Sequence, residues 1–197
     1  MSDPEARRDD WERRYDEGKT GWDRGAPSPA LAHWLAQGRV PAGRVLVPGC
    51  GHGHEVAELI RTGHAVTAVD IAAQPVRRLG EQLAALGLDA ELVQADLLHW
   101  RPVAPFDAVY EQTCLCALDP GHWAAYERRL ADWLRPGGVL LASFMQTGAA
   151  GGPPFDCPMP AMRALFTTER WAWPDAPPLE APHPNGLVEL CLVLTRR

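Results

Sequence analysis

A glycine-rich loop follows an apolar run early in the chain and offers a backbone that a ligand can approach closely. The run 44–47 leads directly into Gly49, Gly51 and Gly53, which alternate with larger residues. Glycine has no Cβ, so such a loop turns tightly at the carboxyl end of a strand and leaves room for a bound molecule. His54 stands where a dinucleotide-binding loop needs its third glycine, so the sequence favours a ligand without a pyrophosphate.

Two aspartates end the next apolar segments and could bind the sugar and base of a nucleoside. Asp70 closes the run 65–69 and comes 19 residues after Gly51, where a carboxylate can accept hydrogen bonds from both ribose hydroxyls. Asp96 follows the third run, where its carboxylate could accept a hydrogen bond from the amino group of an adenine, and Leu97 could pack near the adenine ring. The ordered set predicts an adenosine site. The alternative is that both aspartates only cap helices.

The elements that must position these residues alternate between strands and helices. Short continuous apolar runs are separated by segments of helical periodicity, as in a parallel sheet that is covered on both faces. The last two runs, 171–173 and 187–194, have a proline-rich stretch and no helix between them, so we expect them to pair antiparallel at the C-terminal edge. The predicted strands of the parallel part are 44–47, 65–69, 91–93, 106–110 and 139–144.

Length and charge exclude several classes of protein. A chain of 197 residues suits one domain, which we expect to span 1–197, with an N-terminal segment 1–40 and a core 41–197. A net charge of −6 and a single lysine predict neither a nucleic-acid nor a membrane partner. The N-terminus is charged where a signal peptide is apolar, and the five cysteines show no paired spacing. These features predict a cytoplasmic protein, which we expect to be a monomer.

Eight tryptophans are the unusual feature of the composition, and two of them, Trp11 and Trp22, lie in the first 22 residues. Buried tryptophans often anchor a helix to a core, and this remains the alternative for both. Trp34, Trp123 and Trp133 lie on helix faces and are expected in the core.

Five segments carry a resemblance to a known family. They are Trp11–Tyr15 (WERRY), Gly18–Asp23 (GKTGWD), Val47–Gly51 (VPGCG), Tyr110–Leu118 (YEQTCLCAL) and Gly151–Phe155 (GGPPF). With them the chain resembles the thiopurine S-methyltransferase family, including its thiol and halide methyltransferase branch. These are S-adenosylmethionine-dependent methyltransferases of the Rossmann-like class.

The resemblance implies an α/β class I methyltransferase fold, with a mostly parallel seven-stranded sheet, an antiparallel C-terminal edge, helices on both faces and an N-terminal helical lid. It also implies the residues that bind S-adenosyl-L-methionine: Trp11, Tyr15 and Trp22 in the lid, Gly49 and Gly51 in the loop, Asp70 on the ribose, Asp96 and Leu97 at the adenine, and Gln112 at a strand end. Two residues depart from the family pattern. Tyr15 replaces a tryptophan, and Gln112 replaces a tyrosine or an arginine, which leaves a neutral amide at that position.

The implied reaction is methyl transfer to a small soft nucleophile, with a thiol as the first choice. No catalytic residue is assigned, because a thiol already provides some thiolate at neutral pH; Tyr15 and Glu111 are the only proton acceptors worth testing. Alternative functions are a halide or chalcogen methyltransferase, a nicotinamide-dependent oxidoreductase, and a binding domain without catalysis.

The cysteines and histidines in the glycine-rich loop and in the segment 110–118 need hypotheses of their own. Cys50, His52 and His54 form a C-x-H-x-H pattern, but side chains on a glycine turn are expected to diverge, so no metal site is predicted. Cys114 and Cys116 point to opposite faces if the backbone there is extended, although Cys114 could line an acceptor pocket.

Overall fold

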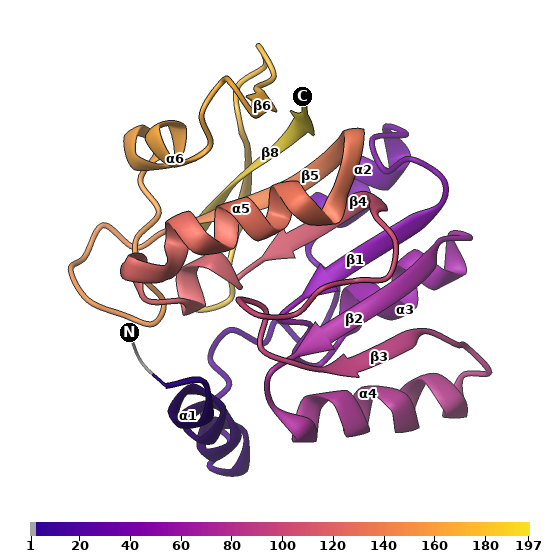
Figure 1. Ribbon diagram of the computed structural model, residues 1–197. Helices are drawn as coiled ribbons and strands as arrows, with labels where there is room; N and C mark the ends of the chain where they lie inside the picture. Colours follow the sequence, from indigo (N-terminus) through magenta and orange to yellow (C-terminus); the bar gives the residue numbers. More distant parts are fainter. Residues whose placement is uncertain (1–2) are drawn as a thin grey trace.

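A central sheet with five parallel strands carries the site. The computed structural model describes residues 3–197, and its sheet order is β3-β2-β1-β4-β5-β8-β6, with β7 also on β8 (Figure 1). The strands are β1 (Arg44–Pro48), β2 (Ala65–Asp70), β3 (Glu91–Gln94), β4 (Phe106–Gln112), β5 (Leu134–Gln146), β6 (Trp171–Ala172), β7 (Leu179–Pro182) and β8 (Val188–Arg196). Strands β1 to β5 pair in parallel, and β8 is antiparallel to β5. The predicted α/β class with an antiparallel C-terminal edge is confirmed.

The sheet has eight strands where seven were predicted. Strand β8 pairs with β5 along one edge, so β6 and β7 both lie along its other edge, near opposite ends of β8. The additional strand β7 lies in the proline-rich stretch. An edge strand tolerates proline, because the backbone groups on its open side form no hydrogen bonds with another strand. The missing N–H of Pro182 therefore costs no pairing. Two short strands therefore share the position that one strand was expected to fill.

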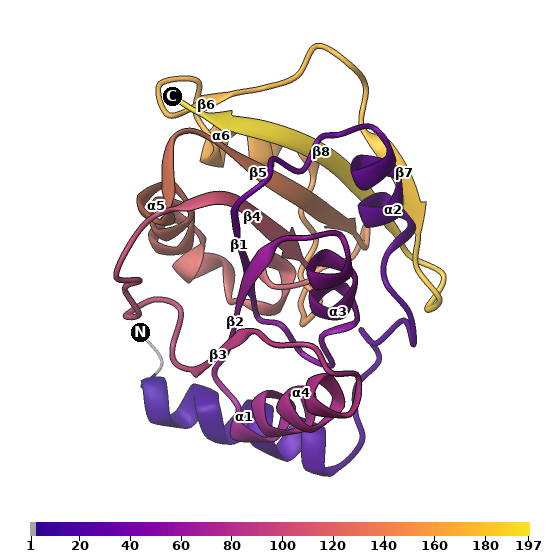
Figure 2. The same cartoon turned by 90° about the vertical axis from the view of Figure 1, so that its right-hand side faces the viewer.

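Helices cover both faces of the sheet (Figure 2). They are α1 (Pro4–Asp16), α2 (Pro29–Ala36), α3 (His54–Arg61), α4 (Ala73–Ala85), α5 (Trp123–Trp133) and α6 (Met159–Leu165), with 3-10 turns at Leu115–Ala117 and Pro120–His122. Helices α2, α3 and α4 contribute to one hydrophobic cluster, and α5 and α6 contribute to a second on the opposite face. None of the helices within residues 3–197 is long and apolar enough to cross a membrane.

The N-terminal segment divides into a covering helix and a core helix. Helix α2 belongs to the core, because Leu31 and Trp34 are buried against the sheet, so the lid is shorter than the predicted segment 1–40, whose first two residues lie outside the described part. Helix α1 lies beyond the carboxyl ends of the central strands, beside α4 (Figures 1 and 2). Tyr15 is its one buried residue.

Polar contacts hold α1 in this position. Glu12 accepts a hydrogen bond from the backbone N–H of Ala73, and Asp16 accepts one from Gln74 at 2.9 Å. Both partners belong to the first turn of α4. Asp3 caps the first turn of α1, because its side chain accepts a hydrogen bond from the N–H of Glu5. Pro4 is the first residue of the helix, where a backbone N–H would have no partner within the helix.

Candidate functional site

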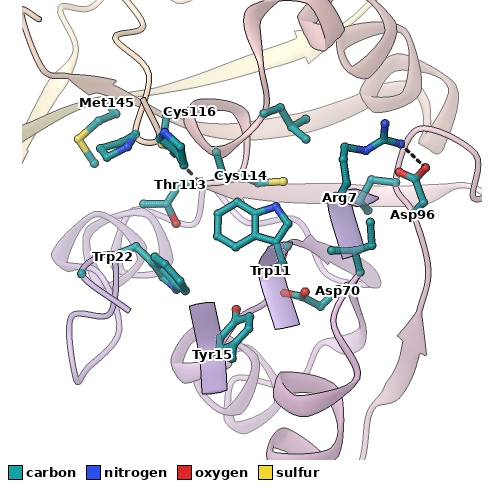
Figure 3. A pocket seen from close by; sticks show the side chains of 18 of the residues that line it. Arg7, Trp11, Tyr15, Trp22, Asp70, Asp96, Thr113, Cys114, Cys116 and Met145 are labelled. Carbon is teal, nitrogen blue, oxygen red and sulfur yellow. Dashed lines mark hydrogen bonds and ion pairs between the residues drawn. The ribbon is translucent and has the colours of Figure 1, made fainter. Parts of the chain in front are cut away.

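A cavity of about 270 Å³ lies between α1 and the carboxyl ends of β1, β2 and β4. Seven of the nine predicted site residues line it: Trp11, Tyr15, Trp22, Gly49, Asp70, Asp96 and Leu97. Gly51 and Gln112 do not line this cavity, and both line a separate small void. Thus the chain brings together residues from positions as far apart as α1 and the loop after β3 (Figure 3).

Glycine is required at position 49 because the backbone turns sharply beneath the cavity. Its φ is +59°, in the left-handed region, and a Cβ there would lie 2.9 Å from the Sγ and 3.1 Å from the Cβ of Cys114. The loop is also attached to the second strand, since the N–H of Cys50 donates to the carbonyl of Val69 at 3.0 Å. The glycine loop therefore forms a fixed, closely packed floor.

Asp70 is a buried carboxylate that keeps capacity for a ligand. Its Oδ2 accepts the N–H of Gly51 at 3.1 Å and its Oδ1 accepts the N–H of Ala72 at 3.0 Å. Each carboxylate oxygen can accept a second hydrogen bond, so both oxygens remain able to bind hydroxyl groups. Burial raises the pKa of Asp70 to about 6, against the lowering effect of these N–H groups. The group is therefore still ionised at neutral pH.

Three aromatic side chains cover this floor from the lid. Trp22 makes edge-to-face contacts with Trp11, at 5.4 Å between ring centroids, and with Tyr15, at 5.5 Å. Aromatic edges and faces in this arrangement attract each other, and the exposed faces of the rings are able to stabilise a cation. Trp11 lines the cavity (Figure 3), as expected of a residue that contacts a ligand there, so its position agrees with the binding role as well as with a structural anchor.

Asp96 has partners that the sequence did not reveal. The Nη2 of Arg7, on α1, lies 2.6 Å from Asp96 Oδ2, and His99 Nδ1 reaches the same oxygen at 2.6 Å. Although burial raises the pKa of Asp96, the hydrogen bond from His99, the N–H of Leu98 and the charge of Arg7 outweigh it and lower the pKa below its usual value. Arg7 was missed because it stands among other charged residues, where no pattern separates a site residue from a solvated one.

The opposite end of the cavity carries no charge among the residues that line it there. Thr113, Cys114, Cys116, Met145, Pro153 and Pro154 form this end. The two cysteines were expected on opposite faces, but the chain bends into the turn Leu115–Ala117, so both line the same cavity (Figure 3). Burial raises the pKa of both thiols well above the usual range.

Comparison with known proteins identifies the chain's relatives. The model of the thiopurine S-methyltransferase family matches residues 6–174. The chain belongs to the thiopurine S-methyltransferase family. This confirms the family expected from the sequence. The chain is 34% identical over 149 residues to a probable thiol methyltransferase 2 of Arabidopsis thaliana and 30% identical over 166 residues to a thiopurine S-methyltransferase of Pseudomonas putida.

The matched regions and a solved structure define the extent of this likeness. The match covers 74% of the chain and 66% of the Arabidopsis protein, just under two thirds, against 76% of the Pseudomonas protein. Among solved structures, an N1-methyltransferase of Burkholderia thailandensis with bound 1,6-didemethyltoxoflavin and S-adenosylhomocysteine superposes with a TM-score of 0.79 at 25% identity. The alignment covers 100% of this chain and 91% of that one.

Among the predicted site residues, Gln112 is the one whose position differs most from the expectation. Its Nε2 donates to both carboxylate oxygens of Glu189, at 3.3 and 3.1 Å, and its Oε1 accepts from the hydroxyl of Tyr110 at 3.1 Å. An amide can donate to a carboxylate and accept from a phenol at once, so these buried partners turn it away from the cavity. Thr113, the next residue, lines the cavity instead; its φ of +56° shows the bend of the chain at the end of β4.

Neither suggested proton acceptor suits that role in this structure. Burial, together with the charge of Asp70, raises the pKa of Tyr15 far above its usual range, so the phenol stays protonated. Glu111 does not line the cavity: its Oε1 accepts the N–H of Leu115 at 2.6 Å, and its Oε2 is buried without a partner. Burial raises the pKa of Glu111 to about 8, against the effect of that N–H group.

This buried acid predicts an unusual pH dependence of stability. In the folded chain Glu111 holds a proton up to about pH 8, whereas its ordinary pKa is 4.5, so folding takes up a proton between these values. The associated stabilisation is complete below the lower value and is lost as the pH rises through the higher one, at up to about 1.4 kcal/mol per pH unit. The Glu111→Gln variant keeps the acceptor for Leu115 but does not titrate. Its free energy of unfolding in urea should therefore fall less between pH 5 and 8 than that of the native chain.

The native slope contains contributions from other buried acids as well. Burial raises the pKa of Asp70 to about 6 and that of Glu189 to about 7, and both act in the same direction. Equal slopes in the native chain and in Glu111→Gln would mean that Glu111 is ionised in the folded protein.

Proposed function

We propose that the chain is an S-adenosyl-L-methionine-dependent methyltransferase whose acceptor is a small soft nucleophile, with a thiol as the preferred class. Membership of the thiopurine S-methyltransferase family supports the methyl donor, and the cavity supports the acceptor. We also propose a monomeric cytoplasmic enzyme without a nucleic-acid or membrane partner, which is consistent with its net charge of −6 and single lysine.

The nucleoside part of the donor fits the charged end of the cavity. Asp70 would accept the ribose hydroxyls, and Leu97 would pack near the adenine, with Asp96 beside it. Arg7 already holds Asp96, so any contact of this carboxylate with the base must use its remaining acceptor capacity. The methionine part would lie over Gly49, with Gly51 supporting Asp70 from behind.

One observation carries the choice of acceptor: one end of the cavity has no charged residue in its lining. Arg7 and Asp96 form an ion pair on one side and Asp70 lies below Trp11, while Thr113, Cys116 and Met145 lie on the other side and form the neutral end (Figure 3). A strongly charged acceptor would find no counter-ion at the neutral end and would pay the full cost of losing its hydration. A small polarisable group such as a thiol suits that end.

Methyl transfer in such a site needs orientation more than acid–base chemistry. The sulfonium of the donor is already activated, and holding the reactants in line at about 3–3.5 Å supplies much of the rate enhancement. The aromatic side chains Trp11, Tyr15 and Trp22 exclude water and offer ring faces to the sulfonium, at roughly 0.5–2 kcal/mol per well-placed ring. A thiol acceptor with a pKa near 8.5 is partly ionised at neutral pH, so no residue is required as its base.

The proposal is tested in two steps with the purified chain. Isothermal titration with S-adenosylhomocysteine is expected to give one binding site per chain. Absence of binding at millimolar ligand would contradict the proposal that S-adenosyl-L-methionine is the methyl donor. Release of S-adenosylhomocysteine is then measured with thiols, hydrogen sulfide, thiopurines, halides and selenium species as acceptors. We expect the highest kcat/KM with a small uncharged thiol or hydrogen sulfide, and preference for halides would reject the acceptor class. Binding without turnover on any acceptor would favour the domain without catalysis.

A further inference from the structure

A cluster of two histidines and an aspartate lies outside the cavity, between the lid and the glycine loop. His52 Nδ1 lies 3.1 Å from Asp23 Oδ2, and His54 Nε2 lies 2.8 Å from Asp23 Oδ1. One possible ligand atom from each of the three residues lies within 4.8 Å of the others. The two histidines were expected to diverge. They converge because the glycines on both sides of His52 have positive φ, which removes the alternation of an extended chain.

The cluster has features that hydrogen bonding within it does not explain. His52 Nδ1 is buried and makes no hydrogen bond, although Asp23 Oδ2 lies 3.1 Å from it. All three residues also line a void of about 40 Å³. Such a void is large enough for a water molecule. An unsatisfied imidazole nitrogen beside a carboxylate, with space for water, is a typical precursor of a metal site.

We propose that Asp23, His52 and His54 bind a divalent transition-metal ion of the zinc class, with water as a further ligand. Two imidazole nitrogens and one carboxylate oxygen suit zinc, cobalt or nickel and disfavour magnesium and calcium, which prefer oxygen ligands. In a tetrahedral site with bonds of about 2.0–2.1 Å, ligand atoms lie about 3.3 Å apart. The three ligand atoms lie within 4.8 Å of one another, so the side chains would have to move closer together to bind an ion. Cys50, the remaining member of the sequence pattern, is buried in the core and is not one of the three residues whose ligand atoms lie within 4.8 Å of one another.

The ion would strengthen the contact between two parts of the proposed methyl-donor site that already meet through the hydrogen bond between His54 and Asp23. Asp23 directly follows Trp22 of the lid, whereas His52 lies between the glycines of the loop, next to Gly51. The backbone N–H of Gly51 donates to Asp70. A bound ion would therefore fix the lid to the loop that supports the ribose-binding carboxylate. Methyl-transfer chemistry does not require it, so this site is separate from the proposed function.

The test is zinc binding to the tag-free full chain without any methyl donor, measured by isothermal titration at neutral pH. We expect one zinc ion per chain. Removing a residue that only holds a metal ligand in place weakens metal binding by roughly 10- to 100-fold. His54→Asn and Asp23→Asn remove ligands themselves, so each should weaken zinc binding at least as much. Asp23→Asn keeps an oxygen that can accept the N–H of Gly25, so it preserves the local turn. The matched control is His33→Asn, an exposed histidine on α2, which should bind zinc as the native chain does.

Cobalt replaces zinc in a second measurement that identifies the donor atoms. Nitrogen and oxygen ligands give visible absorption bands without an intense thiolate-to-cobalt band in the near ultraviolet. Such a spectrum, lost in His54→Asn, supports the site. A thiolate band, no binding below millimolar zinc, or equal affinity in the native chain and both cluster variants would overturn it.

Discussion

Replacing Asp70 by alanine is expected to weaken the binding of S-adenosylhomocysteine by about 1.5–3 kcal/mol, or roughly 10- to 150-fold. The carboxylate is buried and is held by two backbone N–H groups in a position to accept both ribose hydroxyls. Its loss removes charge-assisted hydrogen bonds that no neighbouring side chain replaces. Isothermal titration gives the dissociation constant, and a urea unfolding curve of the same sample shows whether the variant is folded.

The matched control for this variant is Asp107→Ala at the other end of the sheet. Asp107 also accepts a backbone N–H, from Arg44 at 2.8 Å, but it does not line the cavity. This variant should lose stability and keep its affinity for the ligand. The native chain should show a weaker form of the Asp70 effect when the pH falls through about 6, because the carboxylate is then protonated. An unchanged dissociation constant in folded Asp70→Ala would mean that the ribose lies elsewhere.

Replacing Gly49 by alanine should damage both stability and ligand binding. The new methyl group would approach Cys114 Sγ to 2.9 Å in a backbone conformation with φ of +59°, and Cys114 is buried and short, so it has little freedom to move. The left-handed conformation costs about 1–2 kcal/mol and the overpacking about 1–3 kcal/mol. We expect a loss of roughly 2–5 kcal/mol in the free energy of unfolding and at least tenfold weaker binding of S-adenosylhomocysteine.

Gly87→Ala separates the conformational cost from the close contact. Gly87 has a φ of +64°, close to that of Gly49, but a Cβ there would have no atom within 4 Å. It lies beyond the end of α4 and away from the cavity. This variant should lose only about 1–2 kcal/mol of stability and bind the ligand normally. Equal effects of the two substitutions, in urea unfolding and in titration, would show that the contact with Cys114 does not matter.

The sequence predicted those parts of the fold that depend on local pattern. Apolar runs located the strands of the parallel sheet, and the absence of a helix between the last two runs predicted the antiparallel edge. The position of Asp70 followed from its place at a strand end, because the carboxyl ends of parallel strands meet at one edge. Strand β7 was missed because it lies in a proline-rich stretch, and its own proline, Pro182, is compatible with an edge strand that needs hydrogen bonds on one side only.

The residues that were misplaced or missed depend on contacts between distant segments. Gln112 was assigned to the site from its place at a strand end, but its partner Glu189 lies 77 residues later and turns the amide away. Arg7 reaches Asp96 across 89 residues. The convergence of His52 and His54 depends on backbone angles at two glycines, which residue types alone do not specify. None of these contacts produces a periodic pattern of residue types in the sequence.

The two cysteines in the cavity wall have a consequence for the acceptors that the site can accept. Cys114 and Cys116 are thiols that line the cavity proposed for the methyl donor, and burial raises the pKa of each, which favours the protonated, less nucleophilic form. The same water-poor surroundings must also resist the ionisation of an incoming thiol. If the chain transfers methyl groups as proposed, we expect its thiol acceptors to be ranked by their own acidity: an aromatic thiol or hydrogen sulfide, which loses a proton readily, should react faster than a less acidic alkyl thiol of equal size.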